Sequence, residues 1–512
     1  MPVSTVSSWT DTVADTRSLV QFRTSTIRQK GRTRWFTGIL ITLTLLSAVT
    51  PAFLPGAADY TLKHSRAFEM FLLLPTAYAG FLALTAISAV ASGGGRELVA
   101  RDHAVAFPIS PAVDHLGALL MAPLNIAWLL QGWMLLGLTA YVVGPAALVF
   151  AHVIALLWLV FATALAQVVA WTMEAIRRGP NGVLWVRLIT GAVGLAAVLL
   201  IVTKHVSVVL DHLPTLRLVA VLAGLTQGVG IAYPITLLIL VALILGAVLL
   251  GVVPARAALR RAPRDEARIE TGTFPARPNP AGPFLAMVRM DRSSVWRAVS
   301  LRRGIYLLAA APGLIALSGS LEWKMLTILP GLVASGAALL FGVNAFCLDG
   351  RGGLWRDTLP VSPSLAFAAR SWVLLELLLV SSATTLALAA LRAGRPTVEE
   401  VTALLCAWLV VSVQVVSLSM RWSVKQPFSV DLRSARATPA PPLFMVGYSA
   451  RLALSTTIIG MIFSGLAQVP DWRASVMFAI PFVVWSFVRL MRVRGQWADP
   501  QQRSRVIATV SA

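Results

Sequence analysis

The sequence predicts an all-α membrane protein that crosses the bilayer many times. Hydrophobic residues make up 57% of its 512 residues and charged residues only 13%, whereas a soluble domain carries about 25% charged residues. A spanning helix needs about 20 apolar residues, and twelve windows of roughly that length follow one another along the chain. Motifs that recur in both halves further predict two parallel six-helix repeats, each preceded by an amphipathic interfacial helix.

Residues 1–34 are the first predicted element, a basic segment at the cytoplasmic membrane surface. Its six basic side chains accompany a loose apolar stripe of Trp9, Val13, Val20 and Ile27. This composition is typical of a helix that lies in the interface with its basic face toward lipid headgroups. A disordered basic tail is the alternative interpretation.

The first predicted membrane unit covers residues 35–253. Residues 218–230 are apolar but too short to span the membrane beside the sixth window, so they predict a re-entrant or outer-surface helix. Backbone of that kind is tolerated in a membrane only where protein or water covers its polar groups. The six predicted spans of this unit are residues 35–57, 68–92, 116–138, 146–172, 185–203 and 231–253.

The second half begins with a linker over residues 254–283, where arginines alternate with six prolines. Such a composition is typical of an extended linker without a core. A second interfacial helix follows over residues 284–303, with apolar side chains spaced among charged ones. The second membrane unit covers residues 304–491, and residues 492–512 form a predicted cytoplasmic tail. Its six predicted spans are residues 304–320, 325–346, 370–390, 398–420, 447–467 and 474–491.

Lysine and arginine residues are distributed unevenly between the two predicted faces of the membrane. With twelve spans both termini lie on one face, which holds 34 of the 43 basic residues, whereas the opposite loops hold 8. Because basic loops remain in the cytoplasm, the asymmetry predicts that both termini are cytoplasmic. The same rule explains the net charge of +21 without nucleic acid, for which the chain carries no motif.

The clearest repeat lies in two predicted cytoplasmic loops, residues 93–115 and 347–370. The motif FPISP in the first loop matches LPVSP in the second, and an acidic residue lies ten positions before each motif. Serine followed by proline is typical of a helix start. A mixed polar and apolar segment before each motif predicts a short amphipathic element that transmits force from a docked partner. The predicted coupling residues are Glu97, Asp102, Phe107, Pro108 and Ser110 in the first loop, and Asp349, Asp357, Leu359, Pro360 and Ser362 in the second.

Four polar residues inside the spans are candidate intramembrane contacts, because charge in a bilayer is rare. Glu376 and Arg451 lie toward the same end of their spans, which predicts that they pair; a proton-coupling role for Glu376 is the alternative. Gln167 and Gln414 belong to a second repeated motif, QVVxxxM. We expect them to form hydrogen bonds between helices, and a substrate contact is the alternative.

Together these features resemble the membrane subunits of ABC exporters of the type-2 permease class. In that class an interfacial helix precedes six spans, and a short coupling helix lies between spans 2 and 3. A small outer or re-entrant helix often precedes span 6. The resemblance covers nearly the whole chain as two fused units, and at residue level it rests on Glu97 with FPISP and Asp349 with LPVSP. Residues 468–473 depart from the pattern, because they leave no room for an outer helix in the second half.

The resemblance implies a permease for ATP-driven export of a hydrophobic or amphiphilic small molecule, such as a drug, antibiotic or lipid-like compound, across a bacterial inner membrane. A P-loop needs a lysine directly after a glycine, and none of the five lysines has one. The resemblance therefore implies two copies of a separate ABC ATPase that bind ATP and Mg. The chain itself is expected to hold no catalytic residue, cofactor or metal, and its two cysteines do not form a disulfide framework.

Two other classes of protein remain compatible with this topology. A proton-coupled secondary transporter with two fused six-helix halves is the main alternative, and it predicts sensitivity to the proton gradient and to loss of Glu376. An intramembrane transferase would need acidic or histidine residues clustered at an interface, and the six histidines are scattered over both faces. A scaffold without transport activity leaves no mark in the composition.

Overall fold

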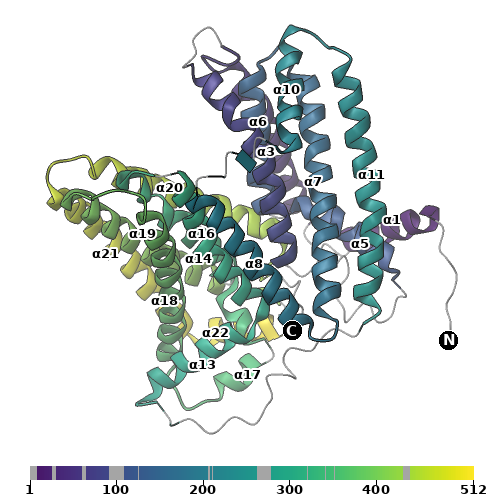
Figure 1. Cartoon of the computed structure of the whole chain (residues 1–512). Coiled ribbons are helices and arrows are strands. Elements are labelled where there is room, and N and C mark those ends of the chain that lie inside the picture. Colours follow the sequence, from purple (N-terminus) through teal and green to yellow (C-terminus); the bar gives the residue numbers. More distant parts are fainter. Residues whose placement is uncertain are drawn as a thin grey trace, which may run out of the picture. The chain divides into compact units, whose positions relative to one another are not determined.

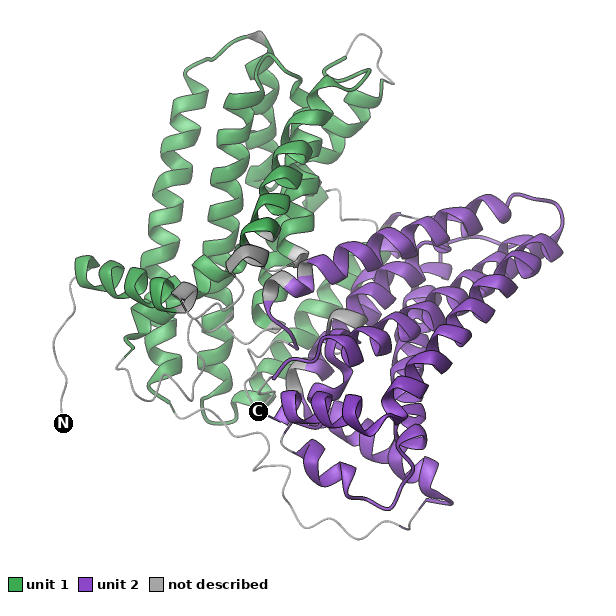
Figure 2. Cartoon of the chain, turned by 180° about the vertical axis from the view of Figure 1, so that it is seen from behind, with its two compact units in different colours: residues 1–264 green, residues 265–512 purple. Residues whose placement is uncertain are grey.

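The structure is a computed structural model, and its described part is helical without strands. The chain divides into two compact units, Met1–Arg264 and Asp265–Ala512, which Figure 2 colours separately. Each unit has an apolar core of its own. The described residues are 9–25, 30–59, 65–91, 109–124, 126–203, 205, 208–209, 212–261, 278, 280–319, 321–340, 342–350, 352–429 and 439–511.

Unit 1 is built around α7 (Leu148–Arg177), which packs against α3 (Arg66–Ala91) and α11 (Ala232–Leu259), as Figure 1 shows. Its core is apolar and aromatic, and Trp158 of α7 donates a hydrogen bond of 3.0 Å to the carbonyl oxygen of Tyr78 in α3. The other helices of the unit are α1 (Trp9–Ser25), α2 (Lys30–Val49), α5 (Pro111–Met121), α6 (Ile126–Val143), α8 (Gly182–Val202) and α10 (Pro214–Gly224).

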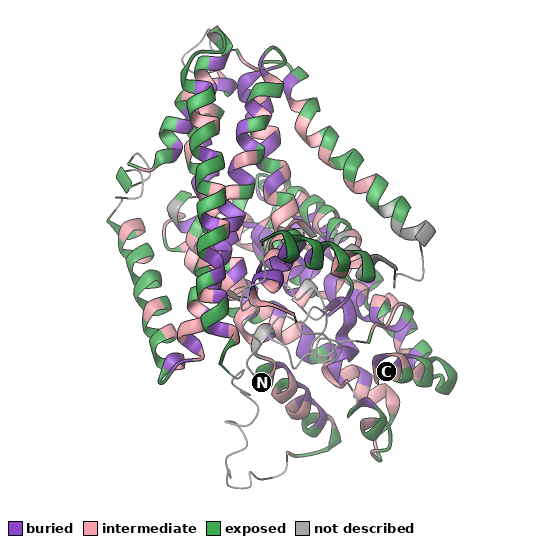
Figure 3. Ribbon diagram, turned by 90° about the vertical axis from the view of Figure 1, so that its right-hand side faces the viewer, coloured by how far each residue is buried: buried purple, intermediate pink, exposed green. Residues whose placement is uncertain are grey.

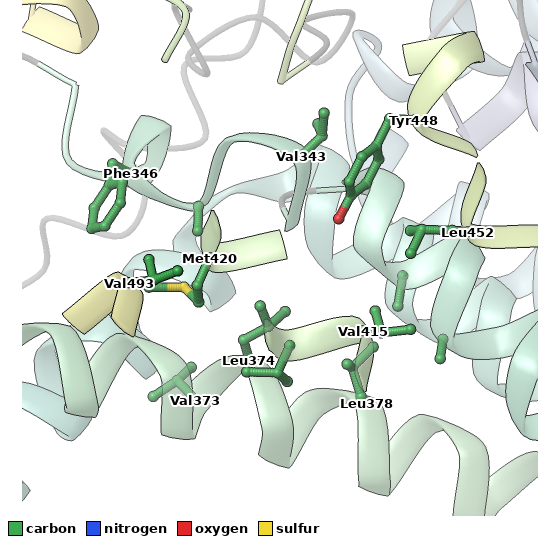
Figure 4. Close-up of a cluster of buried hydrophobic side chains, with 14 of the residues drawn as sticks. Val343, Phe346, Val373, Leu374, Leu378, Val415, Met420, Tyr448, Leu452 and Val493 are labelled. Atoms are coloured by element: carbon green, nitrogen blue, oxygen red, sulfur yellow. The ribbon is translucent and has the colours of Figure 1, made fainter. Parts of the chain in front are cut away.

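Unit 2 is organised around α18 (Pro363–Ala390) and α19 (Val398–Lys425). Both helices contribute to one large apolar core, part of which is drawn in Figure 4. The core extends to α13 (Pro283–Arg297) at one end of the sequence and to α22 (Pro500–Ser511) at the other. The remaining helices are α14 (Val299–Gly319), α15 (Trp323–Leu326), α16 (Leu329–Leu340), α17 (Gly352–Asp357), α20 (Pro442–Leu466) and α21 (Trp472–Ala498).

Eight of the described helices are long and apolar enough to cross a membrane, and the number rises to ten if each of two bent helix pairs forms one span. These eight coincide with eight of the twelve predicted windows. Their outer surfaces are apolar as well: in α8 no residue of the most apolar window is buried, and Figure 3 shows exposed positions along many helices. Lipid covers such surfaces, so the chain is a multi-pass helical membrane protein.

The third predicted window, residues 116–138, is not one continuous helix. α5 ends at Met121, a short 3-10 turn covers Ala122–Leu124, and α6 begins at Ile126. Pro123 lies in the turn, and proline interrupts a helix because it lacks an N–H group and its ring clashes with the preceding turn. The first window is also shortened, since α2 ends at Val49 and a 3-10 turn containing Pro51 follows.

The eighth predicted window, residues 325–346, is broken near its end. α16 stops at Leu340, and the 3-10 helix η4 (Gly342–Leu348) contains a non-helical residue, Asn344. The Asn344 side-chain amide donates hydrogen bonds of 2.7 and 3.0 Å to the carbonyl oxygens of Phe428 and Pro439. This polar anchor stabilises the break, which hydropathy alone does not register.

The predicted tail after residue 491 is helical. α21 continues to Ala498, and α22 follows after the N-cap residue Asp499, whose carboxylate accepts a hydrogen bond of 3.0 Å from the Gln501 N–H. Val506 and Val510 of α22 are buried in the core of unit 2. The C-terminal segment is therefore an integral part of the unit.

Candidate functional site

Four charged side chains form a buried network in unit 2, in the region of the second repeated loop. Asp291 comes from α13, Asp349 from the turn after η4, Arg356 from α17 and Arg370 from α18. Asp291 is completely buried, and Arg370 is only 2% exposed. Four charges from four separate parts of the chain thus converge at one point.

The two arginines bridge the two aspartates. Arg370 Nη2 lies 2.7 Å from Asp291 Oδ1 and 2.7 Å from Asp349 Oδ1. Arg356 Nη1 lies 2.9 Å from Asp349 Oδ1, and its Nη2 donates a hydrogen bond of 3.1 Å to Asp291 Oδ2. Arg370 Nη1 also donates a hydrogen bond to the carbonyl oxygen of Ala345. Every member of the network therefore has at least two polar partners.

The arginines keep the Asp291 carboxylate ionised in α13. Burial alone raises the pKa of this carboxyl, but the guanidinium groups of Arg370 and Arg356 lower it by more, so its pKa lies below the ordinary value. Buried charges are costly unless they are paired and hydrogen-bonded. Because this network satisfies both conditions, separating α13, the loop and α18 exposes unpaired charge in the interior, and the three elements are held as one body.

The short helix α17 presents an apolar surface away from this network. Leu354 and Trp355 are 58% and 66% exposed. The neighbouring Gly353 is buried, and the Arg356 side chain turns inward to the aspartates. One turn of helix therefore carries an exposed apolar pair on one side and a buried charge anchor on the other.

The C-terminal helix α22 covers a further side of the loop. Arg503 Nε lies 2.8 Å from Asp357 Oδ1, and Ser511 Oγ donates a hydrogen bond of 3.0 Å to the carbonyl oxygen of Gly350. A pocket lies where these elements meet, and its walls include Asp349, Arg356, Asp357, Trp497, Arg503 and Ile507. Trp497 closes the inner wall by stacking on Phe346, with ring centroids 4.1 Å apart.

The structure places the predicted residues of the second loop in different environments. Asp349 faces inward to the two arginines, and Asp357 faces α22. Leu359 is partly buried against the core of unit 2, whereas Pro360 is exposed. Ser362 occupies the N-cap position of α18, without a side-chain hydrogen bond.

In the first loop, Ser110 caps α5 and accepts a hydrogen bond of 3.3 Å from the Val113 N–H. The predicted coupling residues Glu97, Asp102, Phe107 and Pro108 lie outside the described residues. The two repeated loops can therefore be compared only at their helix starts, where both segments continue from serine into proline.

The predicted pair between Glu376 and Arg451 is wrong. Glu376 lies 2.8 Å from Arg292 Nη2 of α13 instead, in a pair whose side chains are 33% and 49% exposed. Arg451 lies near Arg489. The pairing of Glu376 with a residue 84 positions earlier follows from the packing of α13 against α18, which no local pattern in the sequence encodes.

The two predicted glutamine contacts also differ from expectation. The Oε1 atoms of Gln167 and Gln414 are buried and accept no hydrogen bond from the described residues. Gln167 lies on α7 and Gln414 on α19, and most of the buried side chains of both helices are apolar. In the described part of the chain, the side-chain oxygens of the two glutamines therefore do not form the interhelical hydrogen bonds that the sequence predicts for these residues.

Sequence reasoning missed the two central members of the network, Asp291 and Arg370. Each is a charged residue beside an apolar segment. From the sequence alone, such residues are expected to face solvent or lipid headgroups. Among the described residues no group of three or more histidine, cysteine or acidic side chains could hold a metal ion. No family model, curated protein or solved structure matches the chain.

Proposed function

We propose that the chain is the permease subunit of an ATP-driven ABC exporter, with two six-helix halves fused and two copies of a separate ATPase supplying energy. One observation carries the proposal: α17 offers exposed Leu354 and Trp355 to a partner while a buried charge network ties it to α13 and α18. A short apolar helix fixed to a spanning helix is what a soluble motor needs in order to move the membrane part.

The contacts define a route for the movement. A push on Trp355 displaces α17, and Arg356 passes the displacement to Asp291 and Asp349. These carboxylates hold Arg370, which lies two turns inside α18. A displacement of the loop thus moves the interfacial helix and a membrane-spanning helix together, and ATP binding in the partner changes access to the transport path.

The cargo proposed for this path is a hydrophobic or amphiphilic small molecule, exported across a bacterial inner membrane. The eight candidate spans contain few charged residues, and the large side chains on their surfaces are mainly apolar. A path of this composition favours apolar cargo over ions, because it offers little to replace the hydration shell of a charge. Twelve spans, parallel repeats and cytoplasmic termini complete the proposal.

The test uses the exposed pair on α17. The variant Leu354→Ser with Trp355→Ser removes the proposed docking surface and leaves the charge network intact. In energised cells we expect the wild-type chain and its ATPase to lower the accumulation of a hydrophobic fluorescent dye, and the variant to lose at least about tenfold of that activity. Membrane levels of the chain should stay equal.

A matched control changes the same residue types at the opposite end of unit 2. Leu391 and Trp472 are 73% and 44% exposed, so Leu391→Ser with Trp472→Ser removes similar apolar surface without touching α17. Equal dye export by both double variants contradicts docking at α17. Export that persists without ATP, collapses with the proton gradient and is lost in Glu376→Gln supports the secondary transporter instead.

A further inference from the structure

Three arginine side chains from three helices of unit 2 gather at one end of the bundle. Arg421 lies one turn before the end of α19, Arg451 lies in the first half of α20, and Arg489 lies in the second half of α21. Consecutive spanning helices run in opposite directions, so the end of α19, the start of α20 and the end of α21 share one membrane face.

Contacts beside Arg421 and Arg451 place these two residues at similar depth. The rings of Trp422 and Tyr448 have centroids 5.4 Å apart. Trp422 follows Arg421 directly, and Tyr448 lies one helical turn before Arg451. The two guanidinium groups therefore start from backbone positions within about one turn of each other along the membrane normal.

The third arginine joins them through the packing of α19 against α21. Met420, which precedes Arg421, and Val493, one turn after Arg489, belong to the same core cluster and lie close together in Figure 4. Arg489 is near enough to Arg421 and Arg451 to be repelled electrostatically by both. The three positive charges thus form one cluster.

No described carboxylate neutralises this cluster. The described acidic side chains in this half of unit 2 are committed elsewhere, since Asp357 pairs with Arg503 and Glu376 with Arg292, and the Asp499 carboxylate accepts a hydrogen bond from the Gln501 N–H. Asp291 and Asp349 belong to the buried network. Like charges held together are unfavourable at the low effective dielectric of a membrane interface, so the cluster is more stable with an anion between its members.

An exposed aromatic ring marks the cluster as lying at the level of lipid headgroups. The guanidinium groups of Arg489 and Arg492 lie 5.8 and 5.9 Å from the ring of Trp485. Trp485 is 56% exposed. Tryptophan and tyrosine concentrate where the hydrocarbon core meets the headgroups, which is also the depth of the phosphates.

We propose that Arg421, Arg451 and Arg489 form a binding site for a phosphate anion, supplied by the headgroup of an acidic phospholipid. Guanidinium groups donate paired hydrogen bonds to phosphate oxygens, and Arg421 and Arg451 are exposed to an approaching headgroup. Three arginines from α19, α20 and α21 that share one headgroup also fix these helices to one another at that end. A soluble phosphate compound has the same binding chemistry, so the experiment separates the two sources.

The test is native mass spectrometry of the purified full chain in detergent, titrated with phosphatidylglycerol, phosphatidylcholine or inorganic phosphate. We expect wild-type protein to retain phosphatidylglycerol in preference to phosphatidylcholine. In Arg421→Gln with Arg451→Gln and Arg489→Gln, that preference should fall by about tenfold. A control that loses the same charge elsewhere, Arg217→Gln with Arg395→Gln and Arg473→Gln, should keep it.

Two comparisons keep the result interpretable if the triple variant folds poorly. Arg451→Lys retains a charge and should preserve most of the preference, whereas Arg451→Gln should lose part of it. Equal binding of the two lipids by wild-type protein, or equal preference in the triple variant and its control, overturns the proposal. Retention of inorganic phosphate that displaces phosphatidylglycerol, and that the triple variant loses, supports the phosphate site and overturns the lipid as its source.

Discussion

Arg370 is the residue on which the candidate site depends most, because it pairs with both buried aspartates. In Arg370→Met the side chain keeps a similar volume, but Asp291 and Asp349 must share Arg356. We expect the free energy of unfolding to fall by about 3–5 kcal/mol, as when one partner of a buried ion pair is removed. Thermal unfolding of the purified protein, followed by tryptophan fluorescence, measures the loss.

The pair between Arg292 and Glu376 supplies the control. The Arg292 side chain is 49% exposed, and solvent screens such a pair, so Arg292→Met should cost at most about 1 kcal/mol. If both variants unfold at the same temperature, the network does not hold the loop to α18. A substitution that changes the charge of Asp349 is unsuitable as a test of docking, because Asp349 pairs with Arg356 and Arg370 and its loss disturbs the protein interior.

A close approach between two helices of unit 1 gives a second prediction at a single residue. A Cβ atom added to Gly251 in α11 would clash with the His115 imidazole of α5, whereas at Gly246 of the same helix nothing lies within 4 Å. Gly251→Ala should therefore destabilise the protein by about 1–3 kcal/mol through overpacking. Gly246→Ala should leave the unfolding temperature unchanged or raise it, because alanine favours the helix.

The double variant with His115→Ala distinguishes this clash from a general effect of the glycine. If the imidazole is the obstacle, removing it restores part of the stability lost in Gly251→Ala. Equal unfolding temperatures for Gly251→Ala and Gly246→Ala contradict close packing of α5 on α11.

At the scale of elements, the sequence motifs predict where helices begin better than hydropathy predicts where spans begin. The serine and proline of each loop do start α5 and α18. The ninth window, in contrast, begins at residue 370, although α18 starts at Pro363. Hydropathy treats Arg370 as the boundary of an apolar segment, but Asp291 and Asp349 neutralise its charge inside the protein. That pairing depends on residues far apart in the chain and is not visible in a local window.

The two helix starts also differ in a way that their shared motif does not show. Ser110 Oγ accepts a hydrogen bond from the Val113 N–H, whereas Ser362 makes no side-chain cap. We expect Ser110→Ala to lower the free energy of unfolding by about 1 kcal/mol, and Ser362→Ala to lower it by much less. Chemical denaturation of the two variants in the same detergent measures the difference, and equal losses would show that the motif acts alike in both loops.

At the scale of the whole molecule, the two halves carry similar loop motifs, but they differ in the charged residues around those motifs. When FPISP is aligned with LPVSP, Ala118 takes the place of Arg370 and Ala104 the place of Arg356. The first half therefore lacks the arginines that fix the second loop to its spanning helix. If a partner docks on both loops as proposed, only the second loop offers it an anchor that contains these arginines, so we expect the second loop to dominate coupling.

The membrane face on which each repeated loop lies depends on how many helices cross the membrane. The described helices supply eight to ten candidate spans, whereas the distribution of basic residues favours twelve with both termini cytoplasmic. In a variant with Cys347→Ala and Cys406→Ala, single cysteines at Leu54, Arg395 and Gln468 should react with an impermeant maleimide in intact cells. A cysteine at Thr271 in the linker should react only after lysis.

Labelling of Thr271→Cys from outside would contradict the cytoplasmic linker and, with it, docking of an ATPase on the neighbouring loops. Protection of Leu54→Cys alone would instead remove the first window from the spans and leave the second loop, with its charge network, on the cytoplasmic face.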